Sequence, residues 1–282
     1  MQMRVGFVVV LAACGSHAVP ATTLALHPAT QPTNAAAAEK LAASTQAITA
    51  LDLDAAKTDL DAVEKTGPLD HDEHVKLWEQ RGIVAAYTDD TAGAKRAFDM
   101  LLALDPGHFL SYYVSPKATF VFEELRNQKD RTPPALDVQW QRGGKVGDPV
   151  PLDLSIVADP KQFLRRATLY VRTRGEASWR AADVPLQKDQ RVVLPPVTAD
   201  KPVSLELYVR AYDDRGNEVL TWADPQRPRE IPLRYDPPPP WYRTWWAITI
   251  ASSVVAIGTG VTVYELTLAP PDKVSGSATV AK

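Results

Sequence analysis

Residues that could do chemistry are few in this 282-residue sequence. His71 and His74 stand three positions apart beside Asp70 and Glu73, a spacing that can place two imidazoles on one metal ion. No third ligand follows at a suggestive position, and the same cluster is typical of the polar start of a helix. The single cysteine, Cys14, excludes an internal disulfide and a cysteine-based zinc cage. We therefore predict no metal site and no cofactor.

The common catalytic motifs are also absent from the sequence. It has no Cys-x-x-Cys, no His-Glu-x-x-His, no Gly-x-Ser-x-Gly and no phosphate-binding Gly-Lys-Ser/Thr loop. Lys and Arg number 31 against 34 Asp and Glu, a net charge of −3, which argues against a dedicated nucleic-acid binder. The sequence predicts a protein that is not an enzyme and has no nucleic-acid partner.

The residues before Cys14 indicate a role for this cysteine. Residues 1–13 combine a lone positive charge, a short apolar run and small residues, as a secretory signal does. The segment 11–14, Leu-Ala-Ala-Cys, resembles the lipobox of bacterial lipoproteins, which implies that Cys14 becomes the first mature residue and carries membrane lipid. A plain signal peptide or a buried first strand is the alternative. Residues 14–33 hold three prolines and no charge, so we expect an extended tether.

Helical spacing begins at Asn34. Capping residues and breakers predict helices over 34–50, 54–65, from 70 onward, 91–104 and 115–126. Within this stretch, five residues fall at the spacings of the tetratricopeptide pattern. They are Trp78, Gly82, Ala94, Phe98 and Pro106. Residues 34–128 therefore resemble a tetratricopeptide (TPR) module, although Arg81 and Ala85 stand where that family prefers Leu and Tyr.

The resemblance implies a binding groove, because the first helix of each TPR unit lines a concave face. It places Lys76, Glu79, Ile83 and Tyr87 on that face, as candidates for contact with a protein partner. Nine Lys and Arg against sixteen Asp and Glu give residues 34–128 a net charge of −7, which would attract a basic partner. The alternative is that these helices only pack together or against the next domain.

After a linker at 129–134, the pattern changes to strands. Seven segments of alternating apolar and polar residues, separated by turn residues, lie within 135–234. They resemble a β-sandwich of the immunoglobulin or fibronectin III type, which implies a spacer or an adhesive platform. Trp140, Trp179 and Trp222 could instead form a surface that stacks on the sugars of a glycan or peptidoglycan, although packing in the core or between the sheets is the favoured role.

The C-terminal region is apolar. A proline-rich spacer at 235–243 precedes a segment, 244–268, for which we predict a transmembrane helix, because residues 244–264 carry no charge and aromatic residues stand at both ends. A buried pair of strands is the alternative. The interfacial aromatics would be Trp245, Trp246 and Tyr264, and a small-residue stripe that could support self-association comprises Ser252, Ala256 and Gly260. Residues 269–282 form a polar tail.

Together these features predict a multidomain chain: an all-α TPR-like module, an all-β immunoglobulin-like sandwich and one C-terminal transmembrane helix. The predicted location is the bacterial cell envelope, with a lipid anchor, a membrane span and both modules in the periplasm. The predicted function is a membrane-anchored adaptor whose helices bind an unidentified protein partner. The alternative is a structural envelope protein whose sandwich contacts peptidoglycan or glycan.

Overall fold

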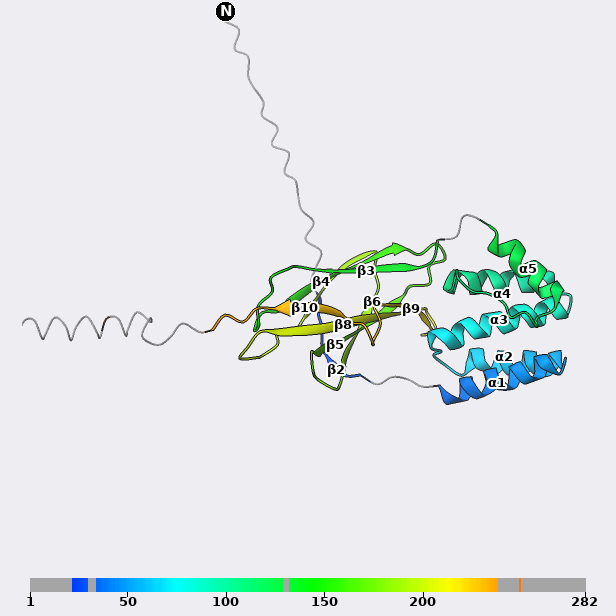
Figure 1. Cartoon of the computed structure of the whole chain (residues 1–282), viewed down its shortest axis with the longest axis horizontal. Helices are drawn as coiled ribbons and strands as arrows, with labels where there is room; N and C mark the ends of the chain where they lie inside the picture. Colours follow the sequence, from blue (N-terminus) through cyan, green and yellow to red (C-terminus); the bar gives the residue numbers. More distant parts are fainter. Residues whose placement is uncertain (1–21, 30–33, 129–131, 238–248, 250–282) are drawn as a thin grey trace, which may run out of the picture. The chain divides into compact units, whose positions relative to one another are not determined.

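A computed structural model describes residues 22–29, 34–128, 132–237 and the single position Thr249. The chain divides into two compact units, Met1–Tyr235 and Asp236–Lys282. Every helix and strand named below belongs to the first unit (Figure 1).

The helices begin where polar side chains cap them. Each N-cap side chain accepts a hydrogen bond from a backbone N–H of the first turn, and Asp70 forms a full capping box with Glu73. The second helix is capped by Asp52, two residues before the predicted Asp54. The five helices are α1 (Ala35–Thr49), α2 (Leu53–Lys65), α3 (His71–Tyr87), α4 (Thr91–Leu104) and α5 (Pro116–Arg126).

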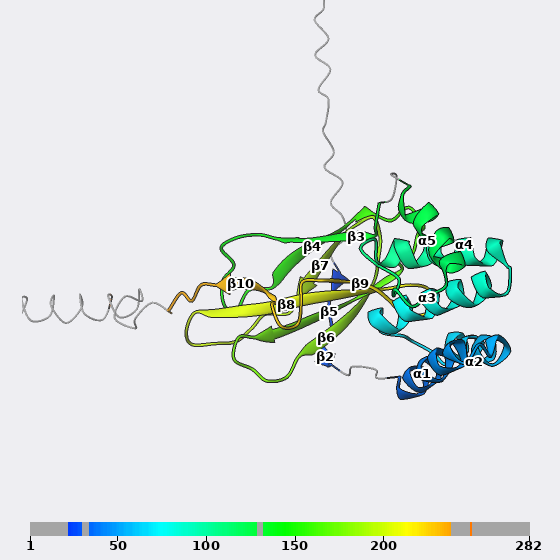
Figure 2. The ribbon, with the colours of Figure 1, turned by 45° about the vertical axis from the view of Figure 1, so that its right-hand side comes forward.

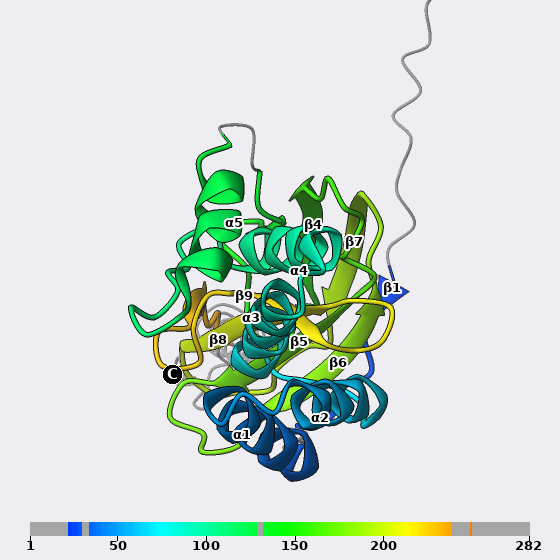
Figure 3. The ribbon, with the colours of Figure 1, turned by 90° about the vertical axis from the view of Figure 1, so that its right-hand side faces the viewer.

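Helix α3 is the centre of the helical layer. It contacts each of the other four helices, with α1 and α2 on one side of it and α4 and α5 on the other (Figure 3). Gly82 makes the closest approach possible, because a Cβ added there would lie 2.3 Å from the ring of Phe98 on α4. Phe98 is fully buried and packs edge-on against Phe122 of α5, with their ring centroids 5.4 Å apart. One small residue therefore allows α4, and α5 behind it, to pack closely on α3.

The remaining elements form two β-sheets. The first has the strand order β1-β7-β4-β3, and the second has the order β10-β8-β5-β6-β2, with β9 also paired to β8. All pairs are antiparallel except β1 with β7. The strands are β1 (Thr22–Thr23), β2 (His27–Pro28), β3 (Ala135–Trp140), β4 (Val150–Ala158), β5 (Arg166–Thr173), β6 (Arg180–Pro185), β7 (Asp189–Leu194), β8 (Val203–Tyr212), β9 (Glu218–Trp222) and β10 (Arg229–Leu233).

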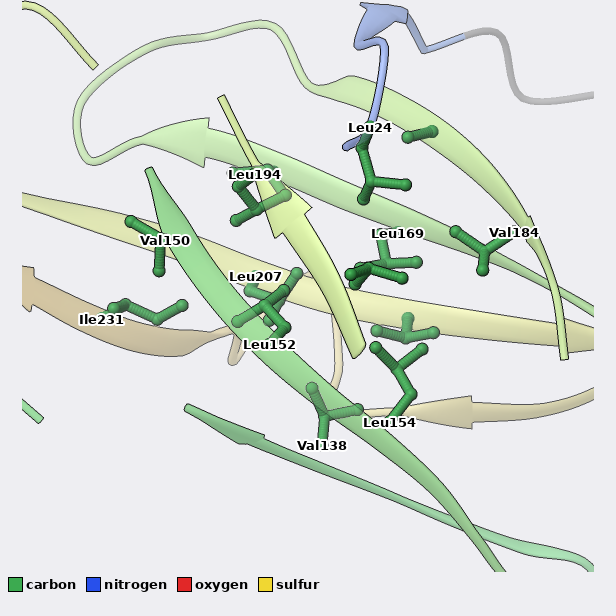
Figure 4. Packing of buried hydrophobic residues seen from close by; sticks show 14 of the residues in the cluster. Leu24, Val138, Val150, Leu152, Leu154, Leu169, Val184, Leu194, Leu207 and Ile231 are labelled. Carbon is green, nitrogen blue, oxygen red and sulfur yellow. The ribbon is translucent and has the colours of Figure 1, made fainter. Parts of the chain in front are cut away.

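The largest apolar core lies between the two sheets. It combines residues such as Leu152 of β4 and Leu169 of β5, both fully buried (Figure 4). Leu24 joins the same core from the segment between β1 and β2, and it is only 6% exposed. The stretch expected to be part of a tether thus pairs with β7 of one sheet and β6 of the other, and inserts a leucine between them.

The helices and the sandwich share a further apolar cluster. Leu104 of α4 packs with Leu164, Ala211 and Val219 of the sandwich, and α3 contacts β9 (Figure 2). The predicted fold class is therefore wrong: five helices and two sheets form a mixed α and β unit, and the helices are not a separate all-α TPR repeat. Helical periodicity shows that a face is apolar, but not whether helices or strands cover it.

The predicted membrane-spanning helix and the membrane-spanning location are also corrected. Among the described residues, no helix is long and apolar enough to cross a bilayer. The longest of them, α3, has 17 residues and carries charges along its length, whereas a span needs about 20 mostly apolar residues. The predicted span at 244–268 lies outside the described residues apart from Thr249. So do Cys14, Trp245, Trp246 and Tyr264, and also Ser252, Ala256 and Gly260.

Candidate functional site: a groove along helix α3

Helix α5 and the loop before it cover the face of α3 that the sequence predicted to bind a partner. Ile83 is buried in the cluster formed with α4 and α5. The hydroxyl of Tyr87 accepts a hydrogen bond from the backbone N–H of Ser115, at 3.0 Å. Glu79 lies 3.5 Å from Nε2 of His108 in the α4–α5 loop. Of the four predicted groove residues, only Lys76 is exposed.

The residues predicted to pack the two helices together occupy different environments. Gly82, Ala94 and Phe98 are buried where α3 meets α4, and Pro106 is exposed in the loop that follows α4. Trp78 is only half-buried. Part of its ring packs against the helical core, and part of its surface is left open on the other side of α3.

That open side is a groove between α2 and α4, with α3 as its floor. Its cavity has a volume of about 240 Å³. We call it the Trp78 groove and define it by six of its lining residues: Lys57 and Asp61 of α2, Trp78, Arg81 and Ala85 of α3, and Arg96 of α4.

The Trp78 groove exists because of two side chains on its floor. Arg81 and Ala85 are the positions at which the sequence departs from the tetratricopeptide pattern, where Leu and Tyr are preferred. Ala85 leaves empty the space that a Tyr ring would fill, and the Arg81 guanidinium lies 5.8 Å from the centroid of the Trp78 ring. From the sequence, both residues are only mismatches to that pattern, and no groove was predicted from them.

Arg81 is held in place by carboxylates of α2. Its Nη2 donates to Asp61 at 2.9 Å and to Glu64 at 2.5 Å. Glu64 also binds Arg215 of the turn between β8 and β9. Burial works against ionisation of Glu64, but the hydrogen bond from Arg215 and the charge of Arg81 lower its pKa below the usual value. Glu64 is thus a carboxylate at neutral pH, and it holds Arg81 in place on the floor of the groove.

Two side chains on the groove floor each contain a donor without an acceptor among the described residues. They are the indole Nε1 of Trp78 and the Nε of Arg81, and both atoms are closed to solvent. Trp78 also lines the cavity toward the sandwich, so these two donors do not by themselves mark a ligand site in the groove.

The rims of the groove carry free positive charge. Lys57 on α2 and Arg96 on α4 are exposed, and within the described part of the chain neither makes a hydrogen bond or an ion pair. Asp90 also lines the groove, but its carboxylate caps α4 by accepting from the N–H of Gly93 at 2.8 Å. After internal pairing, the charge available to a ligand is positive.

Two larger cavities lie where the helices meet the sandwich, and each contains at least one ion pair. In the cavity of about 780 Å³, Arg210 and Glu218 lie 3.3 Å apart, and Glu218 also accepts from Thr221. In the cavity of about 400 Å³, Lys161 pairs with Asp99 of α4, and Arg215 pairs with Glu64.

The other residues that the sequence offered for metal or glycan binding do not come together as a site in the described part of the chain. Nδ1–H of His74 donates to the carbonyl of Glu218 at 3.2 Å, and across the described ranges no group of three His, Cys, Asp or Glu residues could hold a metal ion. Trp140 and Trp222 pack against the core between the sheets. Trp179 packs edge-on against Tyr208 in a separate cluster. The three tryptophans do not form one exposed surface.

Comparisons with known proteins give little further information. No family model matches the sequence, and no curated protein matches it. Among solved structures, the chain is similar to a cohesin module from a Clostridium perfringens ATCC13124 family 33 glycoside hydrolase, with 12% identity and a TM-score of 0.24. That match covers 36% of this chain and 98% of the cohesin module. A likeness at this level carries no argument about function.

Proposed function

We propose that this protein is a non-enzymatic adaptor that binds a protein partner through the Trp78 groove, while its sandwich holds the helical layer in place. The observation that carries the proposal is the groove itself. It combines a half-open tryptophan, an apolar lining and two unpaired cations at its rims.

Each of these features is typical of a binding surface. Tryptophan and arginine are enriched among the residues that contribute most to protein–protein binding. A cavity that is partly filled by an aromatic ring can also receive a side chain from a partner. The groove lies on packed helices, whose positions are fixed by Gly82, Phe98 and the cap at Asp70, so little ordering is needed when a partner binds.

The experiment fills the groove without removing any contact. Ala85→Tyr places an aromatic ring in the cavity, and Ala42→Tyr adds the same ring at an exposed position of α1. A photo-crosslinking side chain at Thr88, an exposed residue that also lines the groove, captures the partner in cells, and the purified partner is then titrated calorimetrically against both variants. We expect Ala85→Tyr to weaken binding at least tenfold, a change of about 1.4 kcal/mol, and Ala42→Tyr to leave it unchanged.

A crosslinker at Lys188, an exposed residue in the turn between β6 and β7, provides the second control. Capture of the same protein from Lys188 and Thr88 with equal yield would count against the groove as the binding site. Equal affinity of the two alanine-to-tyrosine variants, with both folded by circular dichroism, would reject the proposal.

A further inference from the structure

We infer that the Trp78 groove selects an acidic segment of its partner, with one apolar side chain entering the cavity and flanking carboxylates pairing with Lys57 and Arg96. This inference rests on the proposed function and adds the chemistry of the occupant. It differs from what the charge of the helical region predicts, because residues 34–128 have a net charge of −7 and would attract a basic partner.

The charges that line the groove, rather than the net charge of residues 34–128, determine which partner the groove attracts. The acidic residues that line the groove are already engaged: Asp61 binds Arg81, and Asp90 caps α4. Lys57 and Arg96 stand on opposite rims, one on each flanking helix, and within the described ranges neither has an anionic partner. A segment lying across the groove therefore meets a cation on either side.

The size of the cavity limits how the segment binds. A volume of about 240 Å³ is below the usual range of about 300–1,000 Å³ for small-molecule pockets. It is therefore suited to one large side chain. Leu60, Val84 and Ala97 contribute apolar surface to the lining, so an apolar side chain is the natural occupant. The acidic residues of the segment then remain at the rims, where carboxylates keep part of their hydration.

The test uses three peptides of equal length against the full chain. They are acetyl-Glu-Glu-Leu-Phe-Glu-Glu-amide and the versions in which Gln or Lys replaces every Glu. The readout is the indole N–H resonance of Trp78 in protein labelled with ¹⁵N-tryptophan, assigned with Trp78→Phe. We expect the Glu peptide to move this resonance and to bind about tenfold more tightly than the Gln peptide, as two partly exposed charge pairs would give. The Lys peptide should bind most weakly.

The double variant Lys57→Ala/Arg96→Ala should reduce the affinity of the Glu peptide to that of the Gln peptide. Its matched control, Arg142→Ala/Lys188→Ala, removes two exposed cations from the sandwich and should change nothing. Equal affinity for the Glu and Gln peptides, or no effect of the Lys57 and Arg96 substitutions, would overturn the inference. If Ala85→Tyr still abolished capture of the partner, the adaptor function would survive that result; if Ala85→Tyr had no effect on capture, the function itself would fail.

Discussion

At the scale of single residues, Gly82 determines how closely α3 and α4 can approach. Replacing Gly82 with Ala adds about 1 kcal/mol of helix propensity, but the new Cβ would lie 2.3 Å from the buried ring of Phe98. Because that ring is fully buried and cannot move aside, we expect Gly82→Ala to lower the free energy of unfolding by about 1–3 kcal/mol in urea titrations. Gly107→Ala, whose Cβ meets only Asp105 at 3.4 Å, should change it by less than about 0.5 kcal/mol. A Gly82→Ala protein as stable as the wild type would show that the two helices can separate.

Two histidines of the helical layer respond to pH in opposite directions. Glu79, and then Asp105, raise the pKa of His108, so its contribution to stability is complete below about pH 6.5 and is lost as the pH rises through the folded-state pKa. Burial lowers the pKa of His74, so its contribution is present above about pH 6.5 and is lost as the pH falls. Each histidine thus offsets part of the effect of the other.

Glu79→Gln should separate the two effects. Without the Glu79 carboxylate, protonation of His108 adds less stability, because only Asp105 remains beside it, while protonation of His74 still removes stability. The variant should therefore lose more unfolding free energy than the wild type between pH 7.5 and 5.5, measured by urea titration at each pH. Glu39→Gln, at an exposed position of α1, is the control and should follow the wild type. A Glu79→Gln profile parallel to that of the wild type would mean that His108 is not stabilised by this carboxylate.

At the scale of elements, the short strands β1 and β2 close one side of the sandwich. Their pairing involves only two residues each, so Leu24 supplies most of their attachment to the core (Figure 4). We expect Leu24→Ala to lower the free energy of unfolding by about 2–4 kcal/mol, as for other buried leucines. Leu26→Ala, at a half-buried position nearby, should lower the free energy of unfolding by less than Leu24→Ala does. If both variants unfold at the same urea concentration, the segment at 22–28 is held by its backbone pairing alone.

The elements also show what the sequence could predict. Local signals, such as the caps Asn34 and Asp70 and the alternation in β4, placed most helices and strands near their observed positions. Contacts between distant segments were not predictable in this way. Nothing near α3 in the sequence indicates that α5 covers Ile83 and Tyr87, and the proline-rich composition around Leu24 hides a buried strand connection.

At the scale of the whole first unit, the helices and the sandwich are joined by polar and apolar contacts. The side chain of Asn217, in the turn between β8 and β9, accepts from the N–H of Leu69 at 3.1 Å, and the N–H of Glu218 donates to the carbonyl of Leu69 at 2.9 Å. These bonds hold the start of α3 against β9, beside the apolar cluster around Leu104. Each part has an apolar core of its own, and these shared contacts couple the two parts.

We therefore expect one cooperative unfolding transition for this unit. Helix content, followed by circular dichroism at 222 nm, and tryptophan fluorescence should change at the same urea concentration. Asn217→Ala leaves the buried N–H of Leu69 without its acceptor, so the free energy of unfolding should fall by about 1–3 kcal/mol. The circular dichroism and fluorescence transitions should then separate, with the helices unfolding first. Asn127→Ala, at the exposed C-cap of α5, removes an amide of the same size and should keep the transitions together. Two separate transitions in the wild-type protein would instead mean that the helices fold independently, and that the Trp78 groove is built by the helical layer alone.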